Sequence, residues 1–229
     1  GSLRGARGNS GVILSQLLRG FTKSVKKSQE LDAQAIAAAM EKGVETAYKA
    51  VMKPKEGTIL TVAKSASLKA RELADAGETD LEKYIGDIIE RADYVLSQTP
   101  EMLPALKAAG VFDAGGQGLI VFFEGCLAGL RGQDCEVLEV TTRASAQMKP
   151  IEPIDLEYPY CTEFIVKDAN VDKKTVSEAL QDMGNSMIVA VVEDIVKVHI
   201  HTKHPGQALN KAQECVQRGK RPSPYRGQR

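Results

Sequence analysis

Closely spaced cysteines are absent from this 229-residue sequence. Its four cysteines lie far apart and form no C-x-x-C pair: Cys126, Cys135, Cys161 and Cys215. Disulfide frameworks are built from patterned cysteines in secreted chains, whereas isolated cysteines are typical of reduced thiols. The start of the sequence also has no apolar region of the kind found in signal peptides. We therefore expect a cytoplasmic protein.

Charge imbalance and long apolar runs are absent as well. Lysine and arginine together number 30, and so do aspartate and glutamate. This balance excludes the strong net field that attracts nucleic acids or anionic membranes. No apolar run approaches the roughly 18 residues that a transmembrane helix needs. We predict neither a nucleic-acid partner nor a membrane span.

The first part of the sequence, residues 1–142, predicts an all-helical domain. Apolar residues recur at helical spacing from Asn9 to about Leu130. The predicted helices cover residues 9–27, 33–51, 59–76, 80–97, 99–109 and 119–130. Pro100 would lie in the first turn of the short fifth helix. The last helix is almost wholly apolar and contains Cys126, which predicts burial on most of its sides.

The second part has a different pattern. A short strand is predicted at 135–140, and residues 143–159, with three prolines, predict a linker. Residues 160–217 then predict a small α+β sandwich: a strand at 161–167, a helix at 171–183, a turn at Gly184-Asn185, strands at 186–192 and 194–202, and a helix from Pro205. Residues 218–229 carry five basic residues and no acidic ones, and we expect a disordered, solvated tail.

A glycine-rich stretch, Gly5 to Gly11, is the first candidate functional motif. Three glycines in seven residues precede a predicted helix, whose N-terminus offers free N–H groups and the positive end of the helix dipole. Such a terminus suits phosphate, although a small-residue loop can also simply cap a helix. Two further loops, at 53–58 and 112–116, interrupt the helices later in the chain.

These three loops, in this order and separated by helices, resemble the nucleotide-binding domain of the dihydroxyacetone kinase family. Residues 5–16 look most like the ATP-binding subunits of bacterial fatty acid kinases. The segments 160–164, 194–202 and 204–206 are similar to the middle domain of those subunits. The resemblance covers residues 4 to about 214 and implies a helical barrel with the nucleotide at one mouth, followed by the α+β domain.

The resemblance also implies a set of nucleotide-binding residues. Gly8, Asn9, Ser10 and Gly11 would hold the phosphates of ATP, Thr58 would offer a hydroxyl contact, and Asp113, Gly115 and Gly116 would form the wall by the adenine or ribose. Two of these residues have an alternative explanation. Thr58 could equally be an ordinary helix N-cap, and Asp113 an ordinary turn residue.

The implied activity is ATP-dependent phosphorylation of a fatty acid, presented by a separate fatty-acid-binding protein, to give an acyl phosphate. In the family, aspartates upstream of the glycine-rich stretch hold the catalytic Mg²⁺, and a further C-terminal domain is expected to dock the partner. We therefore expect this sequence to be a fragment that is inactive alone, and its catalytic residues stay unknown. An alternative substrate is a small polyol such as dihydroxyacetone.

The second candidate site is a metal centre in the α+β domain. Alternate residues of a strand share a face, so His199 and His201 lie opposite the apolar Val196, Val198 and Ile200. The same parity turns Cys161 and Glu163 away from the core. If the two strands are neighbours, Cys161, His199 and His201 form a zinc ligand set, with water, Glu163 or another chain in the fourth position. The alternative is a bare sheet face.

A metal on an uncovered sheet face would also suit a dimer interface. The rival to the kinase hypothesis is therefore a metal-binding assembly module, without activity of its own, that forms a homodimer.

Overall fold

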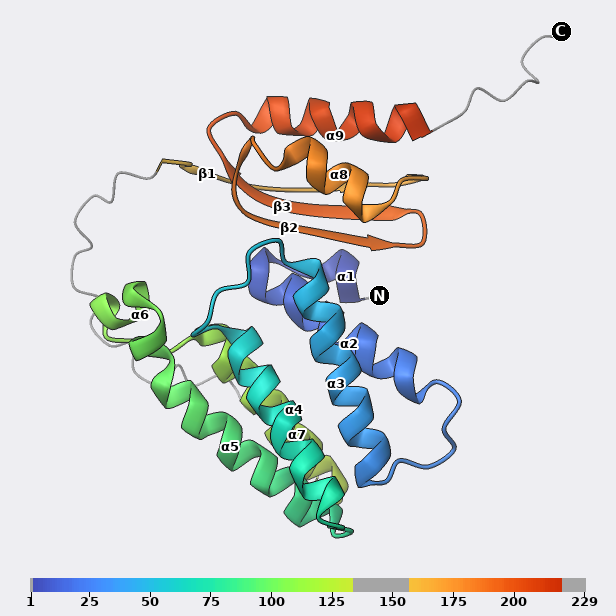
Figure 1. Ribbon diagram of the computed structural model, residues 1–229, viewed down its shortest axis with the longest axis vertical. Coiled ribbons are helices and arrows are strands. Elements are labelled where there is room, and N and C mark those ends of the chain that lie inside the picture. The colour runs from blue at the N-terminus through green and yellow to red at the C-terminus, as the bar shows by residue number, and fades with distance from the viewer. Residues whose placement is uncertain (1, 134–156, 220–229) are drawn as a thin grey trace, which may run out of the picture. The chain divides into compact units, whose positions relative to one another are not determined.

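The computed structural model describes residues 2–133 and 157–219, which form two compact units (Figure 1). One unit comprises Gly1–Val12, Ala50–Lys53 and Asp155–Arg229, and the other comprises Ile13–Lys49 and Pro54–Ile154. The strand predicted at 135–140, nearly all of the linker at 143–159 and most of the tail at 218–229 lie outside the described residues. The domain boundaries therefore stay a prediction.

The first part of the chain is helical, as predicted. Its helices are α1 (Ser2–Gly5), α2 (Gly8–Val25), α3 (Ala33–Ala50), α4 (Ile59–Asp75), α5 (Leu81–Met102), α6 (Pro104–Ala109) and α7 (Ala114–Leu130). Asp80 begins α5 by accepting hydrogen bonds from the backbone N–H groups of Glu82 and Lys83. Gly77 follows α4 and Gly110 follows α6, both with the positive φ that favours glycine at a helix end.

The prediction of a helix start at Pro100 was wrong. Helix α5 continues through Pro100 to Met102, and the short helix α6 begins at Pro104 instead. Proline has no N–H, so in a helix it leaves the carbonyl four residues earlier without its usual donor. Here that carbonyl belongs to Leu96, and the Thr99 hydroxyl donates to it at 2.7 Å. The preceding threonine therefore replaces the bond that the proline removes.

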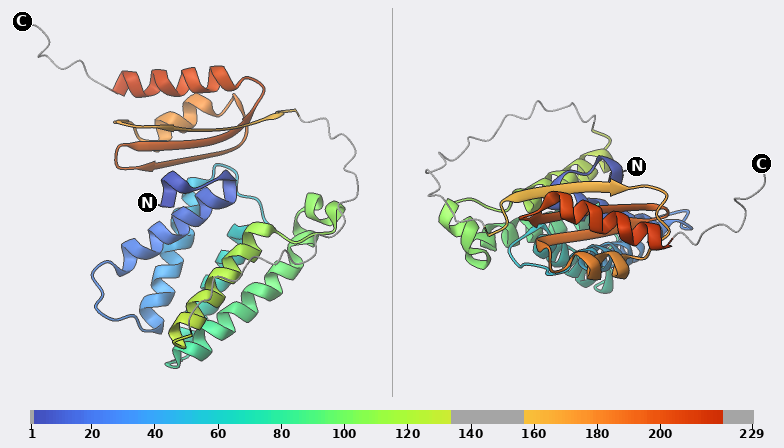
Figure 2. Two further views of the ribbon diagram at one scale, coloured as in Figure 1. Left: turned by 180° about the vertical axis from the view of Figure 1, so that it is seen from behind. Right: turned by 90° about the horizontal axis from the view of Figure 1, so that it is seen from above.

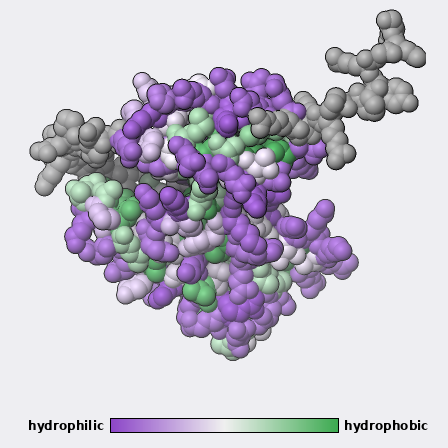
Figure 3. Space-filling view, turned by 45° about the horizontal axis from the view of Figure 1, so that its top comes forward, coloured by the Kyte–Doolittle hydropathy of each residue, from purple (hydrophilic) through white to green (hydrophobic). Residues whose placement is uncertain are grey.

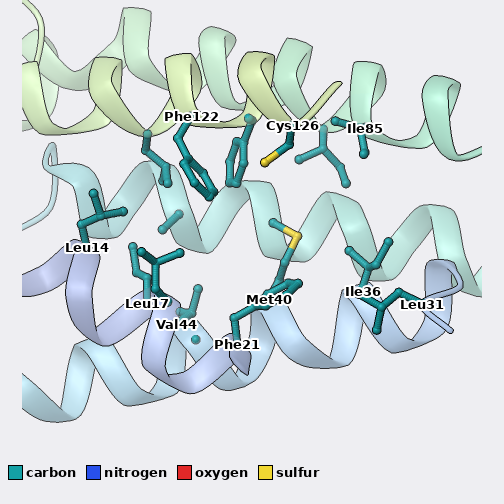
Figure 4. Close-up of a pocket in the computed structure, with 16 residues that line it drawn as sticks. Leu14, Leu17, Phe21, Leu31, Ile36, Met40, Val44, Ile85, Phe122 and Cys126 are labelled. Carbon is teal, nitrogen blue, oxygen red and sulfur yellow. The ribbon is translucent and has the colours of Figure 1, made fainter. Parts of the chain in front are cut away.

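Helix α7 is less buried than its composition predicts. Only Gly116, Leu119 and Ile120 are buried, whereas Val121 is 56% exposed, Phe122 is 42% exposed and Cys126 is also exposed. Part of the apolar surface of α7 instead lines a cavity of about 240 Å³ between helices of the unit that contains Ile13–Lys49 (Figure 4). Leu14, Leu17 and Phe21 of α2 and Met40 of α3 face α7 across this cavity. Its walls are almost entirely apolar, which makes it unsuited to phosphate groups.

The α+β domain has the predicted order of elements. These are β1 (Tyr160–Val166), α8 (Lys173–Leu180), β2 (Gly184–Val192), β3 (Ile195–Thr202) and α9 (Pro205–Gly219). The strands form an antiparallel sheet in the order β1-β3-β2. Figure 2 shows α8 and α9 together on one face of this sheet. The predicted fold class, a helical domain followed by a small α+β domain, is confirmed.

The predicted turn at Gly184-Asn185 was wrong, because both residues belong to β2. Gly184 pairs with Thr202, and a Cβ at this position would lie 2.9 Å from the carbonyl carbon of His201. Glycine is needed here for a close approach of two strands. The pairing shifts between Asn185 and Ile188, where Ser186 has a φ of 52°, so the irregularity lies inside the strand.

The core of the α+β domain lies between the sheet and its two helices. It contains the buried residues Val176, Leu180, Met187, Val189, Val196, Val198, Ile200, Ala208, Ala212 and Val216. Hydrophilic residues cover most of the surface visible in the space-filling view (Figure 3). Among the described helices, none combines the length and the apolar character needed to cross a membrane.

Two glycines bring α2 and α3 into close contact. A Cβ on Gly20 would lie 2.6 Å from the Cα of Gly43 and would also meet the carbonyl of Lys42. A Gly20→Ala substitution should therefore force the two helices apart and lower the free energy of unfolding by about 1–3 kcal/mol, measured by urea denaturation. The matched control is Gly86→Ala in α5, where a Cβ would meet nothing within 4 Å. Since alanine is the better helix former, the control should gain about 0.5–1 kcal/mol. Equal stabilities for the two variants would contradict this assignment.

Tyr84 joins three helices of the same unit. Its side chain is fully buried, and its hydroxyl can donate to the carbonyl of Ala33 at 3.1 Å or of Ala70 at 3.0 Å. Burial raises the pKa of Tyr84 from 10 to about 12, because the phenolate would lose its hydration.

Tyr84→Phe should lower the free energy of unfolding by about 0.5–1.5 kcal/mol at pH 7. Between pH 10 and 12 the unfolded tyrosine is ionised while the native one keeps its proton, so the wild type should lose more stability than Tyr84→Phe as the pH rises through this window. A pKa difference of about 2 corresponds to about 2.7 kcal/mol. Urea midpoints for both proteins from pH 9 to 12 measure this loss. Parallel curves for the two proteins would contradict the prediction.

Candidate functional site

The glycine-rich stretch is largely helical in the structure. Gly8, Asn9, Ser10 and Gly11 form the first turn of α2, and only Ala6 and Arg7 separate this helix from α1. Gly8 has a φ of 60°, which favours glycine at this position. The first N–H groups of a helix have no partner within that helix, so this turn has the donor arrangement expected for phosphate binding.

Asn9 has unused hydrogen-bonding capacity in this turn. Its side-chain oxygen is buried and accepts no hydrogen bond from the residues that the structure describes. A buried amide without a partner is costly, and rotation of the amide would present its NH₂ group at the same place. An anionic oxygen close to the first turn of α2 would satisfy that donor, so the residues of this turn fit a phosphate group.

The other predicted nucleotide residues lie in the second unit, at the adjacent N-termini of α4 and α7. Asp113 is the N-cap of α7, and its carboxylate accepts a hydrogen bond from the backbone of Gly116 at 2.7 Å. The backbone N–H groups of Ile59 and Gly115 also bond this carboxylate and lower its pKa, but burial is the larger effect and the pKa is raised overall. Asp113 therefore links the starts of two helices.

Thr58 and Gly116 have structural roles at the same place. Thr58 is the N-cap residue of α4, but its hydroxyl donates to the carbonyl of Lys55 at 2.9 Å and does not cap the helix. A Cβ on Gly116 would lie 2.8 Å from the side chain of Val62 and 3.0 Å from that of Leu96, so glycine is needed here for helix packing. Any contact of Thr58, Asp113, Gly115 or Gly116 with a nucleotide stays a prediction.

The predicted metal ligands meet across β1 and β3. The two strands are antiparallel neighbours, with Cys161 opposite His201 and Glu163 opposite His199. The ligand atoms of Cys161, His199 and His201 all lie within 4.8 Å of one another, and Cys161 Sγ is 3.8 Å from His199 Nε2. Tetrahedral zinc holds sulfur and nitrogen ligands roughly 3.3–3.6 Å apart. A small contraction of the cluster would therefore form a zinc site.

The protonation of His199 suits metal binding. Burial is the main cause that lowers the pKa of His199, and the neighbouring His201 and Lys197 lower it further, while Glu163 opposes them. The imidazole is therefore neutral at neutral pH, which is the form that binds metals. Cys161 is exposed, so the cluster is accessible from solvent.

The sheet face that carries these residues is covered at Lys197 and His199, whereas the sequence predicted an uncovered face. Lys197 is 1% exposed and His199 is 3% exposed. The ammonium group of Lys197 donates a hydrogen bond to the carbonyl of Ala6, in the segment between α1 and α2. The parity of the strand was therefore predicted correctly, but the covering of the face by the N-terminal segment was not.

Comparison with known proteins places the chain in a family. The family model of the DAK2 domain matches residues 1–128, and the family model of the middle domain of FakA-like fatty acid kinase proteins matches residues 157–219. The chain belongs to the DAK2 domain family, which is a family of kinases, and continues into a middle domain of the FakA-like type.

Several curated bacterial proteins are similar over most of this chain. Protein YloV of Bacillus subtilis (strain 168) is 44% identical over 227 residues, which cover 93% of this chain and 41% of YloV. An uncharacterized protein of Staphylococcus epidermidis (strain ATCC 12228) is 42% identical and SH1689 of Staphylococcus haemolyticus is 43% identical, with the same coverage. The chain thus spans about two-fifths of the length of these relatives.

We expect the chain to bind zinc through the side chains of Cys161, His199 and His201. Cys161→Ser and His201→Ala should each weaken zinc binding by more than the roughly 10–100-fold that loss of an outer partner costs, because each removes a direct ligand. Competition with a chromophoric chelator measures the affinity, and sedimentation in the same samples shows whether zinc also drives dimerisation. The control is His204→Ala, since His204 is exposed and its backbone carbonyl bonds the first turn of α9. Equal zinc affinity in all variants would rule out the site.

Proposed function

We propose that this chain is the nucleotide-binding part of a kinase that uses ATP to phosphorylate a fatty acid carried by a separate fatty-acid-binding protein. The product would be an acyl phosphate. The observation that carries the proposal is the first turn of α2, which begins at the positive-φ Gly8. Among the described residues, the buried side-chain oxygen of Asn9 in this turn has no hydrogen-bond partner, and the first N–H groups of a helix have none within it. Membership of the DAK2 domain family supports ATP as the ligand.

The match to the middle domain favours a fatty acid over a small polyol as the substrate. That match covers residues 157–219 and names FakA-like fatty acid kinase proteins. The substrate, the acyl phosphate and the fatty-acid-binding partner belong to the proposal for the whole protein, of which this chain is about two-fifths by comparison with its relatives.

The described residues do not fit the Mg²⁺ that kinases of this family are expected to use. Among them, the only group of three histidine, cysteine or carboxylate side chains with convergent ligand atoms is Cys161, His199 and His201. Mg²⁺ takes oxygen ligands, and this group offers sulfur and nitrogen. We therefore assign no catalytic residue, and we assign the α2 turn to nucleotide binding alone.

We propose zinc for the Cys161, His199 and His201 cluster, in a structural role. A second function, homodimer assembly, is compatible with it because β1 is an edge strand of the sheet and carries the exposed Cys161. A ligand from a second chain could complete the coordination there. This role would accompany nucleotide binding and does not replace it.

If the first turn of α2 binds ATP, replacing Asn9 should lower the affinity of the chain for ATP. The chain should bind ATP weakly, and Asn9→Ala should weaken binding by about 10–100-fold, because a hydrogen bond to a charged group contributes about 1.5–3 kcal/mol. Isothermal titration calorimetry over a range of Mg²⁺ concentrations measures both proteins. The matched control is Asn210→Ala on the exposed surface of α9, which should leave the affinity unchanged. Absence of ATP binding at every Mg²⁺ concentration would count against the proposal.

A further inference from the structure

A row of buried polar groups leads from the metal cluster to the segment before α2. Two atoms in this row, Glu163 Oε1 and His199 Nδ1, are buried and have no hydrogen-bond partner among the described residues. They lie 3.9 Å apart. Lys197 Nζ lies 3.5 Å from the same Glu163 oxygen and donates to the carbonyl of Ala6. Unsatisfied buried groups of this kind call for an explanation.

The geometry assigns the two nitrogens of His199 to different partners. Nε2 faces Cys161 Sγ at 3.8 Å, so it is the nitrogen that would bind the metal. Nδ1 then carries the proton and faces the Glu163 carboxylate. Metal-bound histidines usually donate their other N–H to a carboxylate, which fixes the orientation of the ring. Glu163 is therefore a positioning residue for His199, and the fourth coordination position is left to water or another chain.

Lys197 connects this carboxylate to the N-terminal segment. An ammonium group that is 1% exposed needs compensating partners, and its partners are the Glu163 carboxylate and the Ala6 carbonyl. Ala6 lies two residues before Gly8, the first residue of α2. Any change that reorients the Glu163 carboxylate changes the pairing of Lys197 and, through it, the anchoring of Ala6.

We propose that metal binding at Cys161, His199 and His201 orders the segment from Gly5 to Val12 through Glu163 and Lys197. The metal would then control how well the first turn of α2 is preorganised for phosphate. This inference rests on the proposed zinc site. By thermodynamic linkage, a phosphate ligand on α2 and the metal would each strengthen the binding of the other.

Hydrogen–deuterium exchange of the whole chain tests the connection, with zinc or with excess chelator and no nucleotide. In the wild type, zinc should slow exchange within residues 6–12 by about 5–150-fold, the usual range of such couplings. The effect should be seen at hydrogen-bonded amides such as that of Ala6, which donates to the carbonyl of Ser2 at 2.9 Å, and not at the first N–H groups of α2. In Lys197→Met the zinc effect should fall below about twofold, since the link to Ala6 is removed. The matched control is Lys203→Met, because Lys203 is 52% exposed and follows the same strand. It should behave as the wild type does.

A second variant tests the link nearer to the metal. Glu163→Gln keeps the shape of the side chain and removes its charge, and it should weaken zinc binding by about 10–100-fold and reduce the zinc effect on residues 6–12. Slow exchange at Val198 and Ile200, in the core of the sheet, reports that each variant is folded. If Lys197→Met loses that protection, Glu163→Gln decides the question alone.

Three results would overturn the inference: no zinc bound by the wild type, zinc bound without any effect on residues 6–12, or a full zinc effect in the folded variants. The first would also remove the zinc site. None of them bears on ATP binding, which the Asn9→Ala titration tests separately.

Discussion

The buried charge of Lys197 constrains the unit that contains the sheet. Removing an ammonium ion from water costs several kcal/mol unless charged and polar partners replace the water. The Glu163 carboxylate on β1 and the Ala6 carbonyl before α2 are those partners. The charge therefore holds together three segments that are far apart in the sequence. A polar strand face without a cover would lie in water, so the burial of this face is what makes these two partners necessary.

Unused hydrogen-bonding capacity distinguishes candidate ligand contacts from residues that the fold itself employs. The Asp113 carboxylate is bonded by backbone N–H groups at the starts of α4 and α7, and the Thr58 hydroxyl donates to Lys55. Asn9, Glu163 and His199 instead each keep a buried atom that makes no hydrogen bond to the part of the chain that the structure describes. Since proteins rarely leave such groups unsatisfied, these positions are the strongest candidates for binding something that the protein chain itself does not supply.

Much of the fold and the convergence of the candidate metal ligands could be predicted from sequence, because both depend on local periodicity. Strand parity alone put Cys161, His199 and His201 on one face, and the register of β1 and β3 agrees with it. What could not be predicted depends on contacts between distant residues. The cover over Lys197 comes from Ala6, 191 positions away. The continuation of α5 through Pro100 depends on a hydroxyl bond from Thr99, and the exposure of α7 depends on which helices surround it. The amino-acid composition of α5 and α7 shows neither the continuation of α5 nor the exposure of α7.

If the proposed metal binds, its affinity would depend on the register in which β1 pairs with β3. Cys161 and Glu163 reach the histidines only in the observed register, in which they face His201 and His199. A slip of β1 by one residue would present Thr162 and Phe164 on that face and turn the thiol and the carboxylate toward the apolar core. Metal would then favour the correct alignment over its nearest competitor, in which neither the thiol nor the carboxylate reaches the ion. An ion at this position would therefore stabilise the observed register of β1 relative to the register shifted by one residue. The backbone hydrogen bonds alone scarcely distinguish these two registers.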